Sequence, residues 1–231
     1  LRLKRPLDFA IVSDHAENMD MVRVCSDPLY DSANAWSCRQ SELLLEGLRW
    51  LGNWLPWANP LCGDGSGECR EAASAVWQDT IEAADRHNQE CDFTTFIAYE
   101  WSGTREGANL HRNVVFRNRQ VPDLPISALD APRPEQLWSA LDSQCRDGKA
   151  GCEAITIPHN PNLSRGLMFP DPSNEKEAKD RLFFEPLVEL VQHKAASECR
   201  FDRLLGRGVA TEDELCDFEQ VQSDNLSMLG T

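Results

Sequence analysis

The sequence has no long apolar run and few positive charges. No stretch of the 231 residues reaches the roughly 18 consecutive apolar residues that a bilayer span needs, so we expect no membrane span. The 23 Lys and Arg are outnumbered by 38 Asp and Glu, which gives a formal net charge of -15. Such a charge repels phosphate backbones and anionic lipids, so we do not expect nucleic acid as a partner. A small anionic substrate is compatible with it if bound metal supplies local positive potential.

Two familiar catalytic or metal-binding patterns are also missing. The chain has no Gly-x-Ser-x-Gly elbow, which argues against a serine hydrolase of the α/β type. It has no C-x-x-C pair among its nine cysteines, which argues against a zinc finger or zinc ribbon. Six cysteines fall instead in close pairs: Cys62 with Cys69, Cys145 with Cys152, and Cys199 with Cys216. This spacing favours local disulfides, with one thiol left over from the odd count.

Disulfides form in oxidising compartments, so the cysteine pairs predict a periplasmic or secreted protein. No apolar segment follows the basic residues at the start of the chain, and we therefore expect the export signal upstream of Leu1. The chain opens at once into an apolar run and ends without a clear helix or strand. We expect it to be a fragment of a longer protein, incomplete at both ends.

The composition is that of a globular protein. Hydrophobic residues make up 41% and charged residues 26% of the chain, and the seven Trp argue against disorder. The length is ordinary for a single α/β or barrel domain, so we expect one domain over residues 1–231.

Short apolar runs alternate with helical patterns, which is typical of β/α units around a largely parallel sheet or barrel. The expected strands are 7–13, 93–99, 113–117, 153–158 and 187–192. The expected helices are 39–51, 70–88 and about 134–144, the last with a proline in its first turn. Residues 52–69 are expected to form an irregular insertion, and residues 170–181 a charged stretch or helix.

Polar side chains directly follow four of these strands: Asp14 with His15, Glu100, His159 and His193. In a β/α barrel the carboxyl ends of the strands form one rim, and such enzymes have their active sites there. Imidazole and carboxylate ligands together suit Zn, Mn or Fe, and several of them can hold more than one ion. His111 adjoins the remaining expected strand, 113–117, whereas His87 lies in an expected helix and is interpreted as a surface histidine.

Each of these residues alone has a plainer explanation. A histidine at a strand end is often a hydrogen-bonded residue of the rim and no ligand. Asp14 is equally suited to cap the following helix through its carboxylate. The convergence of several strand ends is what favours a metal site.

Residues 9–17 (FAIVSDHAE) resemble the second motif of the PHP (polymerase and histidinol phosphatase) superfamily, in which a strand ending in Thr/Ser-Asp-His presents metal ligands. The wider set of motifs resembles the DUF3604 family, an exported-type branch of it. That set comprises residues 96–102, 109–116, 157–161, 188–199 and 216–219. The similarity runs in unbroken order from about residue 7 to residue 219.

The resemblance implies a distorted β/α barrel that binds two or three metal ions and hydrolyses phosphoesters with activated water. By position, Asp14 and His15 match the Asp-His pair and Glu100 matches a carboxylate that can bridge ions. His111 matches a mid-chain histidine and His159 a later one. Asn113 stands where the superfamily usually has a second histidine. The superfamily's opening His-x-His and late Asp-x-His are absent from the chain, which is expected of a truncated fragment and has a degenerate member of the superfamily as its alternative.

The expected metal ligands are therefore Asp14, His15, Glu100, His111 and His159. We expect His193 or His159 to protonate the leaving oxygen and Glu198 to act on the substrate. Arg112, Lys194 and Arg165 are candidates for binding the substrate anion, each with plain surface charge as its alternative. The competing functions are hydrolysis of another ester class, such as sulfate or phosphonate, and a non-catalytic exported binding module.

Overall fold

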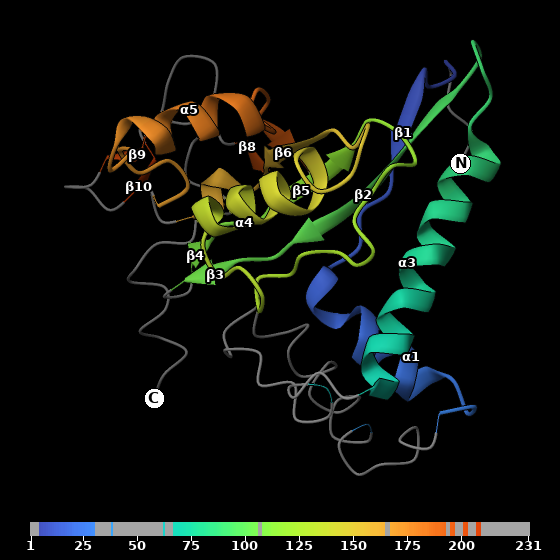
Figure 1. Cartoon of the computed structure of the whole chain (residues 1–231). Helices are drawn as coiled ribbons and strands as arrows, with labels where there is room; N and C mark the ends of the chain where they lie inside the picture. Colours follow the sequence, from blue (N-terminus) through green and yellow to red (C-terminus); the bar gives the residue numbers. More distant parts are fainter. Residues whose placement is uncertain are drawn as a thin grey trace.

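The computed structural model describes residues 5–30, 38, 62, 67–105, 108–164, 167–192, 195–196, 201–202 and 207–208. Its centre is a four-stranded sheet in the order β1-β2-β5-β6 (Figure 1). These strands are β1 (Phe9–Ile11), β2 (Thr94–Trp101), β5 (Arg112–Phe116) and β6 (Ala154–Pro158). All four were expected from the sequence, with bounds that differ by a few residues.

The expected parallel barrel is wrong. Only β1 and β2 run parallel, whereas β2 pairs with β5 and β5 with β6 in antiparallel register. No closed barrel exists among the described residues. The connection between β2 and β5 accounts for the first antiparallel pair, because it spans only residues 102–111 and holds the hairpin β3 (Thr104–Arg105) and β4 (Ala108–Asn109). A parallel crossover needs a dozen or more residues, usually a helix, so this shorter connection returns the chain antiparallel.

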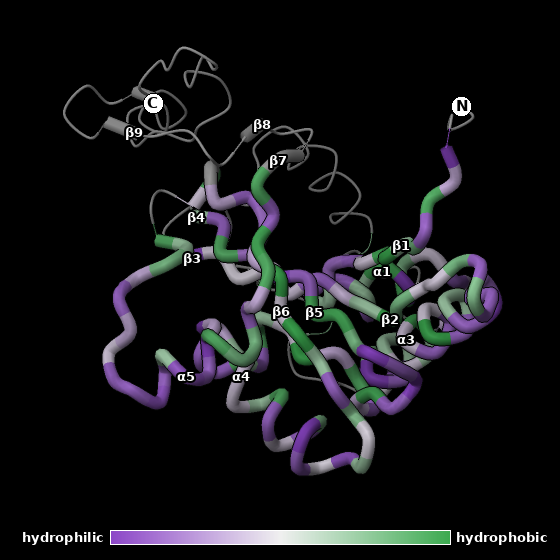
Figure 2. Tube along the Cα trace, turned by 90° about the horizontal axis from the view of Figure 1, so that it is seen from above, coloured by the Kyte–Doolittle hydropathy of each residue, from purple (hydrophilic) through white to green (hydrophobic). Residues whose placement is uncertain are grey.

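Helix α3 (Gly67–His87) confirms the helix expected at 70–88 and packs on both β2 and α1 (Met19–Ser26). A short 3-10 turn, η1 (Ala16–Asn18), leads from β1 into α1. In Figure 2 the mixture of hydrophilic and hydrophobic residues along α3 reflects one buried and one exposed side. Trp77, on the buried side, meets the ring of Tyr99 edge-on at 5.8 Å between centroids.

Helix α4 (Pro134–Leu141), continued by the π-helical η3 (Asp142–Arg146), confirms the helix expected at about 134–144. Helix α5 (Glu175–Phe184) begins where Asn174 accepts a hydrogen bond from the Glu177 amide at 2.9 Å. It overlaps the stretch expected to be charged or helical. The indole of Trp138 donates to Thr156 Oγ1, and that hydroxyl donates to the carbonyl of Phe184, both at 3.3 Å. Both helices are thereby tied to β6.

The described helices cover one face of the sheet. The strand register places Tyr99 opposite Val114 and Val114 opposite Thr156, so these side chains share a face. Tyr99 contacts α3 and Thr156 contacts α4, which puts both helices on that side. Glu100 and Asn113, one residue further along, face the other way. The polar residues considered below therefore belong to the face that the described helices leave open.

The last expected strand is mostly not a strand. Within residues 187–192 only β7 (Val191–Gln192) is extended, and it pairs with β8 (Ala195–Ala196) and not with the main sheet. A further short pair is formed by β9 (Phe201–Asp202) and β10 (Arg207–Gly208). The helix expected at 39–51, and residues 52–61 and 63–66 of the expected insertion, lie outside the described residues. Residues 67–69 belong to helix α3.

Three disulfides join described cysteines. Cys62–Cys69 and Cys145–Cys152 were predicted from their spacing, whereas Cys25–Cys38 was not. Cys91 is a free, exposed thiol, and the predicted Cys199–Cys216 pair lies outside the described residues. The disulfides indicate an oxidising compartment. Among the described residues no helix is both long and apolar enough to cross a membrane.

Candidate metal centre

The antiparallel register gathers four predicted ligands at one edge of the sheet. The carboxyl ends of β2 and β6 adjoin the amino end of β5, and the segment after β1 reaches the same edge. His111 precedes its strand and still joins the site, because β5 runs opposite to its neighbours. Backbone hydrogen bonds fix the arrangement: the Glu100 amide donates to the Asp14 carbonyl at 2.8 Å, and the His159 amide donates to the His111 carbonyl at 3.2 Å.

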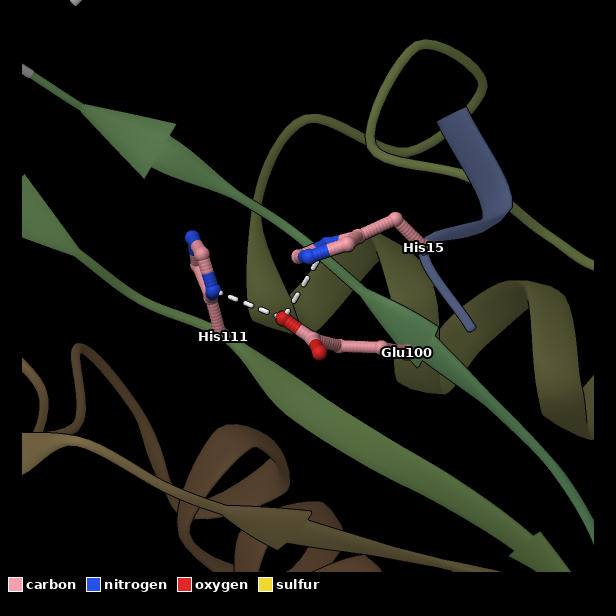
Figure 3. Close-up of side chains that lie close together, drawn as sticks. All are labelled: His15, Glu100 and His111. Carbon is pink, nitrogen blue, oxygen red and sulfur yellow. Dashed lines mark ion pairs between the residues drawn. The ribbon is translucent and has the colours of Figure 1, made fainter. Parts of the chain in front are cut away.

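One carboxylate oxygen, Oε1 of Glu100, lies at the centre of three imidazoles. It is 2.8 Å from His111 Nδ1, 3.3 Å from His15 Nδ1 and 3.3 Å from His159 Nε2. Figure 3 shows His15 and His111 turned toward this oxygen from two sides. The ring of His111 stands nearly perpendicular to that of His15 and at a steep angle to that of His159, with centroids 6.0 and 5.7 Å apart.

Burial and hydrogen bonding shift the protonation of the centre. Burial alone would raise the pKa of Glu100, but the hydrogen bonds from His111 and His159 outweigh it and hold the pKa well below its usual range. Burial lowers the pKa of His111, and the nearby Glu100 carboxylate only partly offsets that shift. At neutral pH the centre therefore holds an ionised carboxylate facing a neutral His111, whose Nδ1–H donates the 2.8 Å hydrogen bond.

The donor set suits a divalent transition metal. The candidate ligand atoms of His15, Glu100 and His111 all lie within 4.8 Å of one another, and His159 Nε2 adjoins the same carboxylate. Imidazole and carboxylate groups at this spacing are the ligands that Zn, Mn and Fe share. His159 Nδ1 is buried without a hydrogen-bond partner. Buried polar atoms without partners are uncommon in folded proteins, so the described part of the chain leaves this centre with an unused ring nitrogen.

Two hydroxyl groups that the sequence did not single out touch the centre. Ser102 Oγ forms a short hydrogen bond with His15 Nδ1 and lies 3.3 Å from Glu100 Oε1. Thr104 Oγ1 lies 3.4 Å from His111 Nε2. Both residues are on the connection between β2 and β5, so this connection orients the ligands as well as joining the strands.

Glu17 is a third residue that sequence reasoning missed, although it lies in the FAIVSDHAE motif. Its side chain is only 3% exposed, and its Oε1 accepts hydrogen bonds from the amides of Ser102 at 3.1 Å and Ala128 at 2.6 Å. The carboxylate thus ties the turn after His15 to the end of β2 and to a distant loop. Its position two residues after a predicted ligand was the available signal.

Asp14 does not join the cluster. Its side chain is exposed, and its part in the site is the backbone carbonyl that accepts from Glu100. No side chain caps η1, so the alternative helix-capping role of Asp14 is not observed either. Asn113, opposite Glu100 in the register, accepts a 2.9 Å hydrogen bond from the Ser13 hydroxyl. It thereby fastens the segment that carries His15.

Arg112 faces away from the site. Its side chain is 1% exposed, on the helix-covered face, and its Nε lies 2.8 Å from Glu185 Oε1. Burial raises the pKa of Glu185, and the contact with Arg112 opposes that rise. The guanidinium also donates to the backbone oxygens of Leu110 and Met168. A guanidinium with these partners is structural, so we do not carry the substrate-binding prediction for Arg112 forward.

The remaining predicted site residues lie outside the described part of the chain: His193, Lys194, Glu198 and Arg165. His87 is exposed at the end of α3, as expected for a surface histidine, with its Nδ1 2.9 Å from the Ala83 carbonyl oxygen.

Three imidazoles around one buried carboxylate, at one edge of a mixed sheet backed by helices, define an α/β protein with a candidate metal centre. The family model described as "Protein of unknown function (DUF3604)" matches residues 1–230, so the chain belongs to this family. No curated protein and no solved structure matches the chain.

Proposed function

We propose that this protein is a metal-dependent hydrolase of phosphoesters. The observation that carries the proposal is the convergence of His15, His111 and His159 on a single oxygen of Glu100, all within 3.3 Å. A purely structural carboxylate would be satisfied by one or two neutral donors. Three imidazoles beside one carboxylate form a donor set that a divalent cation can bind.

The four residues of this cluster would hold the metal, either one ion or part of the set of two or three expected for the longer protein. When bound, a divalent metal ion supplies positive charge that polarises an ester and activates water for attack. The residues of the cluster contribute negative charge and a fixed orientation. Glu100 keeps its negative charge, because its pKa is lowered, and His111 holds that carboxylate in place with its Nδ1–H.

The exposure of the four residues suggests different tasks. His111 and His159 are buried, with 2% and 8% exposure, whereas half of the His15 side chain is exposed. A substrate would therefore approach on the His15 side. His159 has one ring nitrogen beside Glu100 and the other unpaired, so it is the described residue best suited to carry a proton to a leaving oxygen.

The phosphoester class is supported by the resemblance of the motifs to the PHP superfamily. Sulfate and phosphonate esters have a similar tetrahedral, anionic centre and are the nearest alternatives. The net charge of -15 supports a small substrate that enters a local positive site, and not a polyanion that must approach the whole surface. The disulfides support a periplasmic or extracellular site of action.

The direct test is the metal content of His15→Ala. We expect the purified chain to contain Mn, Fe or Zn by plasma mass spectrometry, and we expect the variant to contain less and to turn over phosphoesters more slowly. His87→Ala is the matched control, because it removes an exposed histidine from the end of α3. Equal metal content in wild type and His15→Ala would overturn the assignment of His15 as a metal ligand.

A substrate panel tests the reaction itself. Aryl phosphate, sulfate and phosphonate esters are compared under metal saturation, and we expect the phosphate ester to be hydrolysed fastest. Faster turnover of a sulfate or phosphonate ester would reassign the substrate class. Metal binding without turnover of any ester would assign the chain as a binding module.

A further inference from the structure

Ser102 lies between two groups of the candidate metal centre. Its side chain is 4% exposed, and its hydroxyl contacts both His15 Nδ1 and Glu100 Oε1, the latter at 3.3 Å. No other described hydroxyl contacts two members of the cluster. A buried hydroxyl in this position controls where protons reside, because it has one hydrogen to give and lone pairs to accept with.

The protons in this contact can be assigned from the chemistry of the groups. A carboxylate only accepts, so the Ser102 hydrogen points to Glu100 and the hydroxyl oxygen accepts from the ring of His15. His15 must then carry its proton on Nδ1. The second neighbour of Nδ1 agrees, because Glu100 Oε1, at 3.3 Å, is also an acceptor.

We propose that Ser102 is a positioning residue that holds His15 in the Nδ1–H tautomer and so leaves Nε2 as the ring atom that binds metal. Histidines that bind metals generally donate their second ring N–H to a nearby oxygen, which fixes the tautomer and the ring orientation. Ser102 has that role here, and the inference rests on the proposed metal site. It adds the identity of the coordinating atom.

Glu17 holds the backbone of Ser102 in place. Its carboxylate accepts the Ser102 amide at 3.1 Å and the Ala128 amide at 2.6 Å. Glu17 is two residues from His15, so the imidazole and the hydroxyl that orients it are fastened to the same turn of chain. Glu17 therefore limits the movement of Ser102 relative to His15.

The tautomer is measured directly by NMR. The chain has five histidines, so imidazole ¹⁵N labelling gives five pairs of ring nitrogen signals, and the His15 pair is assigned from its loss in His15→Ala. We expect the metal-free wild type to show the Nδ1–H tautomer at His15 and Ser102→Ala to show more of the Nε2–H tautomer. An Nε2–H tautomer in the wild type would overturn the proposal.

Zinc affinity gives the second readout. Competition of Zn²⁺ with a chelator is expected to show an affinity about tenfold lower for Ser102→Ala than for the wild type, as for other changes beside a metal-binding histidine. Ser127→Ala is the matched control, since Ser127 is also a buried serine but its hydroxyl bonds Asp130 at 2.7 Å. We expect that variant to keep the wild-type affinity.

The outcomes separate this inference from the proposed function. Equal zinc affinity in wild type and Ser102→Ala would overturn the positioning role and leave the metal site intact. Failure of the wild type to bind Zn²⁺ would overturn the proposed metal site, and the inference that rests on it, whatever the tautomer of His15. Loss of affinity in Ser127→Ala as large as in Ser102→Ala would show that any buried serine matters, which contradicts a specific role.

Discussion

Two largely buried carboxylates face opposite sides of the same sheet, and two consecutive residues at the start of β5 supply their partners. Glu100 pairs with His111 on the open face, while Glu185 pairs with Arg112 on the face covered by helices. Both contacts are 2.8 Å long. The two sites are therefore alike in charge and distance and differ in the chemistry of the base.

The difference lies in how completely each base is satisfied. The guanidinium of Arg112 stays protonated and each of its nitrogens has a partner, from Glu185 or from the backbone and side chain of Leu110 and Met168. Of the imidazoles around Glu100, His111 has a pKa that burial lowers, and His159 Nδ1 has no hydrogen-bond partner among the described residues. A permanently charged guanidinium with every nitrogen bonded holds the fold in place, whereas an imidazole with an unpaired ring nitrogen can bind a cation.

The largest expected effect is the loss of folding stability in Arg112→Met. Removal of the guanidinium leaves Glu185 buried without its charge partner, which typically destabilises a protein by about 3–5 kcal/mol. Urea denaturation of the metal-free protein measures the change. The double variant Arg112→Met with Glu185→Met is expected to regain most of this stability. A double variant as unstable as the single one would show that the ion pair is not the cause.

Glu100→Gln tests the other carboxylate. The variant keeps the shape of the side chain but loses its charge, so we expect zinc affinity to fall by more than about 100-fold, the upper end for changes beside a metal ligand. The stability of the metal-free protein should fall by less than in Arg112→Met. Glu185→Gln is the control, expected to lower stability and to leave zinc affinity unchanged. The reverse pattern would exchange the roles of the two carboxylates.

The third prediction concerns pH. In the folded protein the pKa of His111 is lowered from its ordinary 6.5, and that of Glu100 from its ordinary 4.5. As the pH falls, the unfolded chain binds these protons first, so stability decreases below about pH 6.5 and again below about pH 4.5. The variant His111→Gln has no titratable side chain at this position. Between about pH 7 and pH 5 we expect the metal-free wild type to lose more stability than this variant, and equal losses would contradict the lowered pKa of His111.

The smallest expected effect is at an exposed ion pair, which serves as the reference for the Glu100–His111 and Glu185–Arg112 pairs. Arg117 and Glu153 approach to 2.8 Å, as the two buried pairs do, but their side chains are 70% and 60% exposed. Solvent screens such a pair, so Arg117→Ala should cause no resolvable change in stability or in zinc affinity. A loss comparable with that of Arg112→Met would show that burial is not what distinguishes the pairs.

The strands and helices of this sheet were largely predictable because their apolar periodicity is strong. The direction of β5 was not, because alternation of strands with helical patterns was taken to mean parallel pairing throughout. The connection over residues 102–111 contains no helical pattern, and its brevity was the signal for a hairpin. The parallel prediction failed again at the next connection, because β5 and β6 pair antiparallel although residues 117–153 and helix α4 join them.

The candidate ligands could be predicted because they follow or precede strands and match a motif. The residues that position these ligands could not be predicted. Ser102 and Glu17 are common polar residues whose roles depend on contacts 85 residues apart in sequence. The disulfide Cys25–Cys38 has a sequence separation of 13, whereas the two predicted pairs have separations of 7, so close spacing did not reveal it.

The hairpin from β2 to β5 also bears on how the centre is assembled during folding. Glu100 and His111 lie on the two arms of one hairpin, whose closure needs only a short loop and carries a small entropic cost. His15 and His159 come from segments 85 and 48 residues away from them in sequence, so they arrive only when long loops close. Half of the candidate metal centre is thus local in sequence, and the other half needs the complete sheet. A metal ion that requires all four residues can be captured only by a chain that has finished folding.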